Sequence, residues 1–206
     1  MNLTIRDNEI LNFINESGFC TMPQIQKQFD LKAPRSYQVI QRLIVGGYVF
    51  HEQIFRKLHG VYFLTKKGAS LTQLPPLSRI SLGGYKHQLI ITDVRQKLCQ
   101  LYPNSKWTSE RYLKQQKFHY GVGRAGHLAD GILILPDATK VAIEVELSLK
   151  GKHRLENIFR AYGGTLAFSA AWYYCADNII PAISTIAGKR SFIKIYSLKE
   201  LLNEKS

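Results

Sequence analysis

The feature that most limits the possible folds of this chain is a pair of adjacent prolines, Pro75-Pro76. Two successive prolines disfavour helix and mark a boundary between structural segments. A chain of 206 residues suits one large domain or two small ones. We therefore predict two domains, at residues 1–73 and 85–206, joined by a linker at 74–84.

The chain is strongly basic, with 28 Lys and Arg against 15 Asp and Glu and a formal net charge of +13. This excess indicates a polyanionic partner, because each neutralised phosphate releases condensed counterions. Nucleic acid is the first candidate, and an anionic membrane surface is the second. The basic residues are not gathered on one amphipathic stretch, which disfavours the membrane. No apolar run reaches transmembrane length and no signal peptide is visible, so we expect a cytoplasmic protein without membrane insertion.

The predicted first domain begins with three helices. Apolar residues recur at helical spacing between residues 4 and 17, and Thr21 and Pro34 are placed to open two further helices. The third helix is expected at 35–45, with an apolar side that faces the core. Its polar side is predicted to present Arg35, Ser36, Gln38, Gln41 and Arg42.

Two short β-like runs, at 48–51 and 61–64, follow these helices and enclose a basic segment. Three helices and a two-stranded ribbon predict a winged helix-turn-helix. Its third helix can enter the major groove and its basic hairpin can contact phosphates. The predicted DNA-binding residues are Arg35, Gln38, Gln41, Arg42, Arg56 and Lys57. The alternative is a small helical domain that makes protein contacts.

The predicted second domain alternates between strand and helix, which indicates a mixed sheet flanked by helices and, for the whole chain, an α+β protein. We expect helices at 85–102, 152–162 and 179–187 and a helical tail, with strands at 107–113, 131–135, 141–147, 170–175 and 192–196.

Three carboxylates in this domain are placed to meet. Asp130 begins one predicted strand, and Glu144 and Glu146 lie two apart on the next, so that both point to one face. Three carboxylates at one sheet edge are costly unless a cation lies among them. Oxygen ligands favour Mg²⁺ or Mn²⁺, which can polarise a phosphodiester and activate a bound water. The alternatives are an ordinary Asp-Gly turn at Asp130 and a solvent-facing strand side for the glutamates.

Asp130 and Glu144-Val145-Glu146, with a helix after the strand, resemble the PD-(D/E)XK nuclease core. The resemblance implies that Asp130, Glu144 and Glu146 form the metal site. Glu146 stands where that superfamily usually has a Lys that helps to activate water. Lys150 or Lys152 could supply this missing charge, so Lys150 joins the three acidic residues as a predicted catalytic residue.

The combination of a winged helix with this acidic pattern resembles the replication-relaxation family of plasmid proteins and the MOBC relaxases. The resemblance implies a relaxase that nicks double-stranded DNA at a transfer or replication origin, with relaxosome or coupling proteins as possible partners. The alternative is a non-catalytic DNA-binding regulator of transcription or plasmid replication, whose nuclease-like domain is inactive.

Further polar residues surround the predicted site. His127 is a candidate for phosphate contact or proton transfer, or an ordinary packed histidine. Tyr162 is a conceivable nucleophile and more simply a core tyrosine. Glu110 is a candidate fourth metal ligand or half of a surface ion pair. A basic run at the predicted mouth of the site indicates phosphate contacts or a solvated helix start, and it consists of Lys150, Lys152, His153 and Arg154.

Overall fold

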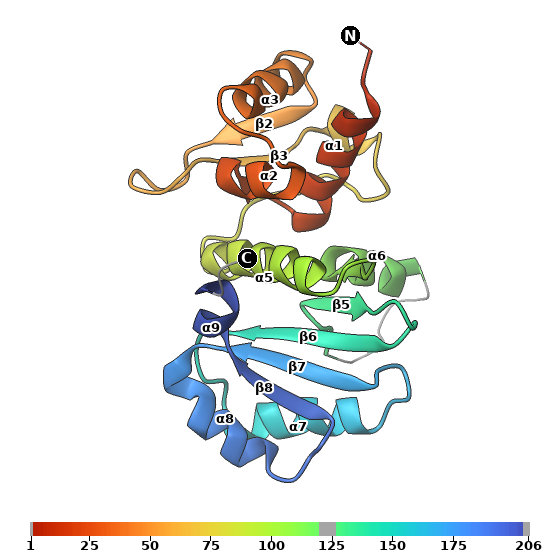
Figure 1. The fold of residues 1–206 in the computed structure, drawn as a ribbon, viewed down its shortest axis with the longest axis vertical. Coiled ribbons are helices and arrows are strands. Elements are labelled where there is room, and N and C mark those ends of the chain that lie inside the picture. Colours follow the sequence, from red (N-terminus) through yellow and green to blue (C-terminus); the bar gives the residue numbers. More distant parts are fainter. Residues whose placement is uncertain (1, 120–126, 204–206) are drawn as a thin grey trace. The chain divides into compact units, whose positions relative to one another are not determined.

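The structure is a computed structural model that describes residues 2–119 and 127–203 (Figure 1). The chain divides into two compact units, Met1–Thr92 and Asp93–Ser206. We call them the N-terminal and C-terminal units and describe each by itself. Their boundary lies within helix α5 (Tyr85–Leu101). No helix among the described residues is long and apolar enough to cross a membrane.

The segment predicted as a linker, 74–84, belongs to the N-terminal unit. Leu74 is buried, and its carbonyl accepts a hydrogen bond of 2.7 Å from the Asn15 side chain. Leu77 and Ile80 are partly buried against a cluster that contains Val61. The two prolines therefore end the preceding structure without releasing the segment from the unit.

The N-terminal unit combines short helices with a three-stranded antiparallel sheet of order β1-β3-β2. Its elements before α5 are α1 (Ile5–Ser17), β1 (Cys20–Thr21), α2 (Met22–Phe29), α3 (Arg35–Val45), β2 (Val49–Glu52), β3 (Val61–Leu64) and α4 (Lys66–Ala69). The three predicted helices and the ribbon are present. Strand β1 was not predicted, because two residues carry no periodic pattern and form a strand only by pairing with β3.

Local signals explain where the first two helices begin. Thr4 and Asp7 exchange hydrogen bonds between side chain and backbone, at 2.8 and 3.2 Å, which forms a capping box at the start of α1. Thr21 and Gln24 repeat this arrangement at the start of α2. Gly18 ends α1 with a φ of 76°, a conformation that glycine adopts at little cost.

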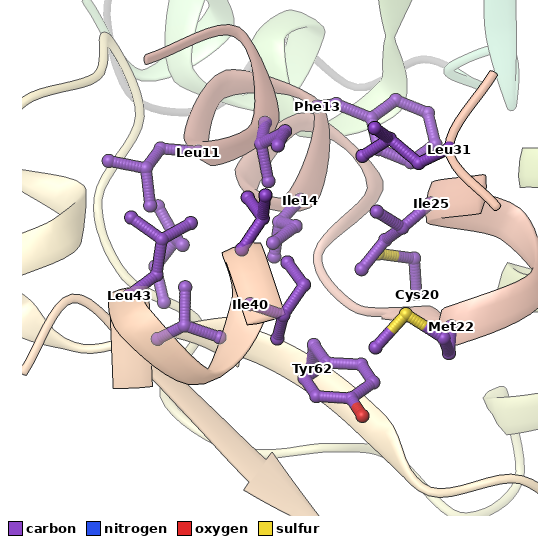
Figure 2. Packing of buried hydrophobic residues seen from close by; sticks show 14 of the residues in the cluster. Leu11, Phe13, Ile14, Cys20, Met22, Ile25, Leu31, Ile40, Leu43 and Tyr62 are labelled. Carbon is purple, nitrogen blue, oxygen red and sulfur yellow. The ribbon is translucent and has the colours of Figure 1, made fainter. Parts of the chain in front are cut away.

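The apolar sides of these helices meet in one core (Figure 2). Leu11 and Ile14 of α1 face Ile40 and Leu43 of α3, and Tyr62 of β3 closes the cluster. The sequence placed Ser36 on the polar side of α3, and this was wrong. Ser36 is buried, and its hydroxyl accepts a hydrogen bond of 2.8 Å from Gln26 of α2.

The C-terminal unit contains a five-stranded mixed sheet of order β4-β5-β6-β7-β8. Strands β4 to β6 pair antiparallel, and β6 to β8 pair parallel. Its elements after α5 are β4 (Lys106–Ser109), α6 (Glu110–His119), β5 (Gly131–Ile134), β6 (Lys140–Glu146), α7 (Lys152–Gly163), β7 (Ala170–Cys175), η1 (Asp177–Ile179), α8 (Ile180–Ala187), β8 (Ile193–Ser197) and α9 (Leu198–Asn203). The expected mixed sheet with helices is confirmed.

One predicted strand is shorter than expected. The strand predicted at 107–113 ends at Ser109, and α6 begins at Glu110. The Ser109 hydroxyl accepts a hydrogen bond of 3.3 Å from the backbone N–H of Tyr112, which is the bond made by a helix N-cap. Glu110 therefore lies on a helix, where it forms an ion pair of 2.7 Å with Lys114 one turn later.

Helices α7 and α8 lie against the face of the sheet that carries Ala142 and Tyr173. Leu155 and Phe159 of α7 and Ile183 of α8 are fully buried in this contact. Glu144 lies between Ala142 and Glu146 on β6 with the same side-chain alternation, so both glutamates belong to the face that α7 covers.

Candidate active site

The antiparallel pairing of β5 and β6 brings Asp130 to Glu144. Gly131 is opposite Ile143, so Asp130, one residue earlier, lies beside the next residue of β6. The Asp130 carboxylate accepts a hydrogen bond of 2.8 Å from the backbone N–H of Val145. Its backbone oxygen accepts another, of 3.3 Å, from the N–H of Glu110. Asp130 therefore fastens the start of β5 to β6, in addition to carrying a charge there.

Glu144 is the centre of the cluster, and only 1% of its surface is exposed. Its Oε1 accepts a hydrogen bond from the Tyr162 hydroxyl of α7 and lies 2.5 Å from Nε2 of His127. Burial raises the pKa of Glu144, and the nearby charge of Asp130 adds to this. The hydrogen bonds from His127 and Tyr162 oppose the rise without cancelling it.

Glu146 is also buried, with 3% of its surface exposed, and Oε1 forms an ion pair with Nζ of Lys150. The burial of both glutamates excludes the alternative that they line a solvent-facing side of β6. Lys150 is partly exposed, so the pair connects the buried cluster with the surface beside the start of α7.

Strand β7 adds two residues that the sequence did not single out. Tyr173 is the register partner of Glu144, and Cys175 that of Glu146. Tyr173 is fully buried, and its hydroxyl has no hydrogen-bond partner in the part of the chain that the structure describes. Burial raises its pKa, as do the charges of the two glutamates, so the phenol keeps its proton. Burial and the charge of Glu146 raise the pKa of Cys175 to about 12.

The acidic residues do not surround a common point as metal ligands. Within residues 2–119 and 127–203, no group of three or more His, Cys, Asp or Glu side chains is arranged to hold a metal ion. The reason is visible in their bonds: Glu144 is held by His127 and Tyr162, Glu146 by Lys150, and Asp130 by a backbone N–H. The donor set nevertheless suits a hard cation, since three carboxylates of like charge share one end of two strands.

The remaining candidates near the cluster fall into two groups. Lys152 and Arg154 are exposed in the first turn of α7, as the predicted phosphate contacts require. Tyr162 is buried and donates to Glu144, and burial with the Glu144 charge raises its pKa, which does not suit a nucleophile. Glu110 pairs with Lys114, as the simpler of its two interpretations predicted.

In the N-terminal unit, the predicted DNA-binding residues occupy different settings. Arg35, Gln38 and Gln41 are exposed on α3. Arg42 is held differently, because its Nη2 lies 2.5 Å from Oδ1 of the buried Asp7.

Arg56 and Lys57 are exposed in the turn between β2 and β3. The Phe55 ring beside them contacts the Tyr85 ring, with 5.0 Å between centroids. The side-chain N–H of Gln53 donates a hydrogen bond of 2.7 Å to the carbonyl of Phe55. This bond stabilises the conformation of the turn. The two basic side chains are thus presented by an ordered turn.

Comparisons with family models, curated proteins and solved structures found no match.

Proposed function

We propose that this protein binds double-stranded DNA through its N-terminal unit and nicks it with a divalent metal ion held by its C-terminal unit. The observation that carries the proposal is the placement of Asp130, Glu144 and Glu146 at the same end of β5 and β6, with both glutamates buried. Burying carboxylates close to one another is unfavourable, and groups perturbed in this way cluster at functional sites.

The order of elements supports both halves of the proposal. A winged helix-turn-helix has the order helix, strand, two helices and two strands, as α1 to β3 do here. The C-terminal unit has three antiparallel strands, then α7, then the parallel strand β7, and α5 precedes them. Asp130 directly before β5, Glu144 and Glu146 on β6 and the helix α7 after that strand agree with the resemblance to the PD-(D/E)XK core.

Asp130, Glu144 and Glu146 would hold Mg²⁺ or Mn²⁺. Bound there, the ion would polarise the phosphodiester and lower the pKa of a coordinated water. The protein's own residues position the DNA around it. Lys150 stands between the buried cluster and the surface, and it supplies the positive charge that Glu146 does not.

Phosphates are held nearby by the start of α7. Lys152 and Arg154 are exposed in its first turn, and the helix has 12 residues. Backbone N–H groups and the helix dipole at such a terminus favour an anion. A DNA strand whose phosphates contact this turn would pass beside Lys150, which connects the phosphate contacts with the carboxylates.

The proposal is tested by incubating the protein with supercoiled plasmid that carries its native locus, with Mn²⁺, with Mg²⁺ or with chelator. We expect metal-dependent conversion to the nicked form, reduced at least about 100-fold by Asp130→Asn and by Glu144→Gln. Asp137→Asn is the matched control, because Asp137 is an exposed acid in the β5–β6 turn. Equal nicking by the Asp130→Asn and Asp137→Asn variants would refute the catalytic site.

A second candidate function is a DNA-binding regulator whose nuclease-like unit does not cut. The ion pair between Glu146 and Lys150 favours it, because it neutralises one of the carboxylates without a metal. Tight, salt-sensitive binding of the same plasmid without cleavage under any metal would select this function. For a relaxase, the DNA partner would be a transfer or replication origin, together with other proteins of a relaxosome.

A further inference from the structure

Helix α3 exposes two glutamine amides that have no partner within residues 2–119 and 127–203. Gln38 and Gln41 are both exposed and lie three residues apart, so they share one side of the helix. Neither side chain makes a hydrogen bond to any other residue in the described part of the chain. Gln24 and Gln26 of α2, by contrast, donate to Leu89 and Ser36 at 2.8 Å.

The two amides border an open hollow with an apolar lining. Besides Gln38 and Gln41, the hollow is lined by Met22, Tyr37, Ile40, Ile44 and Tyr62. Tyr37, at its edge, is 54% exposed, whereas Ile40 and Tyr62 at its base are buried. A solvent-exposed side of α3 thus combines two hydrogen-bonding amides with an apolar surface directly beside them.

The charged residues of α3 suit an anionic partner. Helix α3 contains two arginines and no acidic residue. Arg42, the residue after Gln41, is bonded to Asp7, so its guanidinium is already used within the unit. The groups that remain on this side are Arg35, the two amides and the apolar lining.

In the major groove, one kind of base pair offers partners both for exposed amides and for an apolar hollow. A glutamine amide can donate to N7 and accept from the N6 amino group of adenine, and no other base offers that pattern. The C5 methyl of thymine is the one apolar group that the major groove displays. A single A·T pair therefore presents the adenine edge to a glutamine amide and the thymine methyl to the hollow.

We propose that α3 recognises A·T base pairs in the major groove, with Gln38 and Gln41 bonding to adenine and the hollow beside Tyr37 receiving the thymine methyl. The inference rests on the DNA-binding half of the proposed function and is independent of cleavage. It identifies the specificity residues of the N-terminal unit and the class of sequence that they select.

The test uses the whole 206-residue chain in chelator, so that no cleavage occurs. Bound duplexes are selected from a randomised pool, and affinities for the selected duplex are then measured by fluorescence anisotropy. We expect adjacent A·T pairs in the selected sequences and a loss of about 10-fold when such a pair becomes G·C. Gln38→Ala or Gln41→Ala should weaken this discrimination, while Gln73→Ala, an exposed glutamine outside α3, should leave it intact.

Replacement of thymine by uracil isolates the methyl group. We expect the wild-type protein to lose about fourfold in affinity, as for one buried methyl group. Tyr37→Ala should show less than half of that effect, and circular dichroism of each variant checks that it folds. Tight binding without A·T preference, or an unchanged response to uracil, would overturn the inference alone. Failure to bind any duplex DNA would overturn both the inference and the proposed function.

Discussion

The imidazole of His127 lies 2.5 Å from the carboxylate of Glu144, measured from Nε2 to Oε1. The same oxygen accepts a hydrogen bond from the hydroxyl of Tyr162, so His127, just before β5, and Tyr162 of α7 are both bonded to one buried side chain. Loss of that acceptor would leave polar groups without partners, which costs about 1–3 kcal/mol for each buried group.

The first prediction separates this structural role from charge. Glu144→Gln keeps an acceptor oxygen for His127 and Tyr162 and removes the buried charge, so we expect stability within about 1 kcal/mol of wild type. Glu144→Ala removes the acceptor and should lose about 2–4 kcal/mol. Urea denaturation followed by circular dichroism, in chelator, measures both. Equal stability of the Gln and Ala variants would mean that the two hydrogen bonds contribute little.

The pH dependence of stability provides the second prediction. Burial raises the pKa of Glu144 in the folded protein, so the folded state retains a proton that the unfolded state has already lost. Stability should therefore fall as pH rises from the ordinary carboxyl pKa through the raised value. Glu144→Gln should lack this component, which denaturation midpoints at several pH values would reveal. If stability changed with pH in the same way in the wild type and in Glu144→Gln, the raised pKa of Glu144 would not be the cause.

A third prediction concerns the ion pair of Glu146 and Lys150, whose members are four residues apart and of which Glu146 is buried. Lys150→Met should lower the free energy of unfolding by about 1–2 kcal/mol, because it leaves a buried carboxylate without its cation. This loss is smaller than for a fully buried pair, because Lys150 is partly exposed. The pair of Glu110 and Lys114 has the same spacing, with Lys114 exposed and Glu110 only partly buried, and is the matched control.

Lys114→Met should change stability by less than about 0.5 kcal/mol. A charge exchange, Glu146→Lys with Lys150→Glu, should recover part of the loss seen in Glu146→Lys alone, as a double-mutant cycle would measure. If Lys150→Met is no more damaging than Lys114→Met, the buried pair is not a source of stability.

The parts of the fold that follow from local signals could be predicted from the sequence. Helix α1 is bracketed by Thr4 and Gly18, and α3 begins and ends where its periodicity does. Strand β1 could not be predicted, because Cys20 and Thr21 form a strand only through their pairing with residues some 40 positions later. The end of β4 was not predicted, because residues 107–113 have the pattern of a strand and Ser109 was not recognised as the N-cap of α6.

The candidate site divides in the same way. The approach of Asp130 to Glu144 follows from a short antiparallel hairpin, and alternation along β6 places Glu146 on the same face. The contributions of Tyr162 and Tyr173 depend on how α7 covers the sheet and on the register of β6 with β7, which no local pattern specifies. Periodicity likewise put Arg42 on the polar side of α3 but did not reveal its partner on α1.

The fourth prediction uses that partner, Asp7. Its side chain accepts from the backbone of Thr4 at 2.8 Å and from Arg42 at 2.5 Å, and it is buried. Asp7→Ala should cost about 1–3 kcal/mol, since a capping bond and an ion pair are lost together. Arg42→Ala should have a smaller effect, because the Thr4 bond survives.

The pKa of Asp7 sets the pH range of this contribution. Burial raises the pKa, but the hydrogen bonds from Thr4 and Arg42 outweigh it and leave the pKa below its usual value. The stabilisation is therefore present above the unfolded pKa and is lost as pH falls through the lowered folded value. The stabilities of the wild type and Asp7→Ala, measured as pH is lowered, should converge at low pH. Stability curves that stay apart at low pH would contradict the lowered pKa of Asp7 as the cause.

The last prediction concerns the turn between β2 and β3, which presents Arg56 and Lys57 to solvent. If both contact phosphates, the double variant Arg56→Ala with Lys57→Ala should weaken binding to all duplex sequences alike. The slope of log affinity against log salt should fall by about 1 for each contact removed. Arg6→Ala, which removes an exposed charge from α1, should leave the slope nearly unchanged. A double variant with the wild-type slope would show that the turn does not contact the DNA backbone.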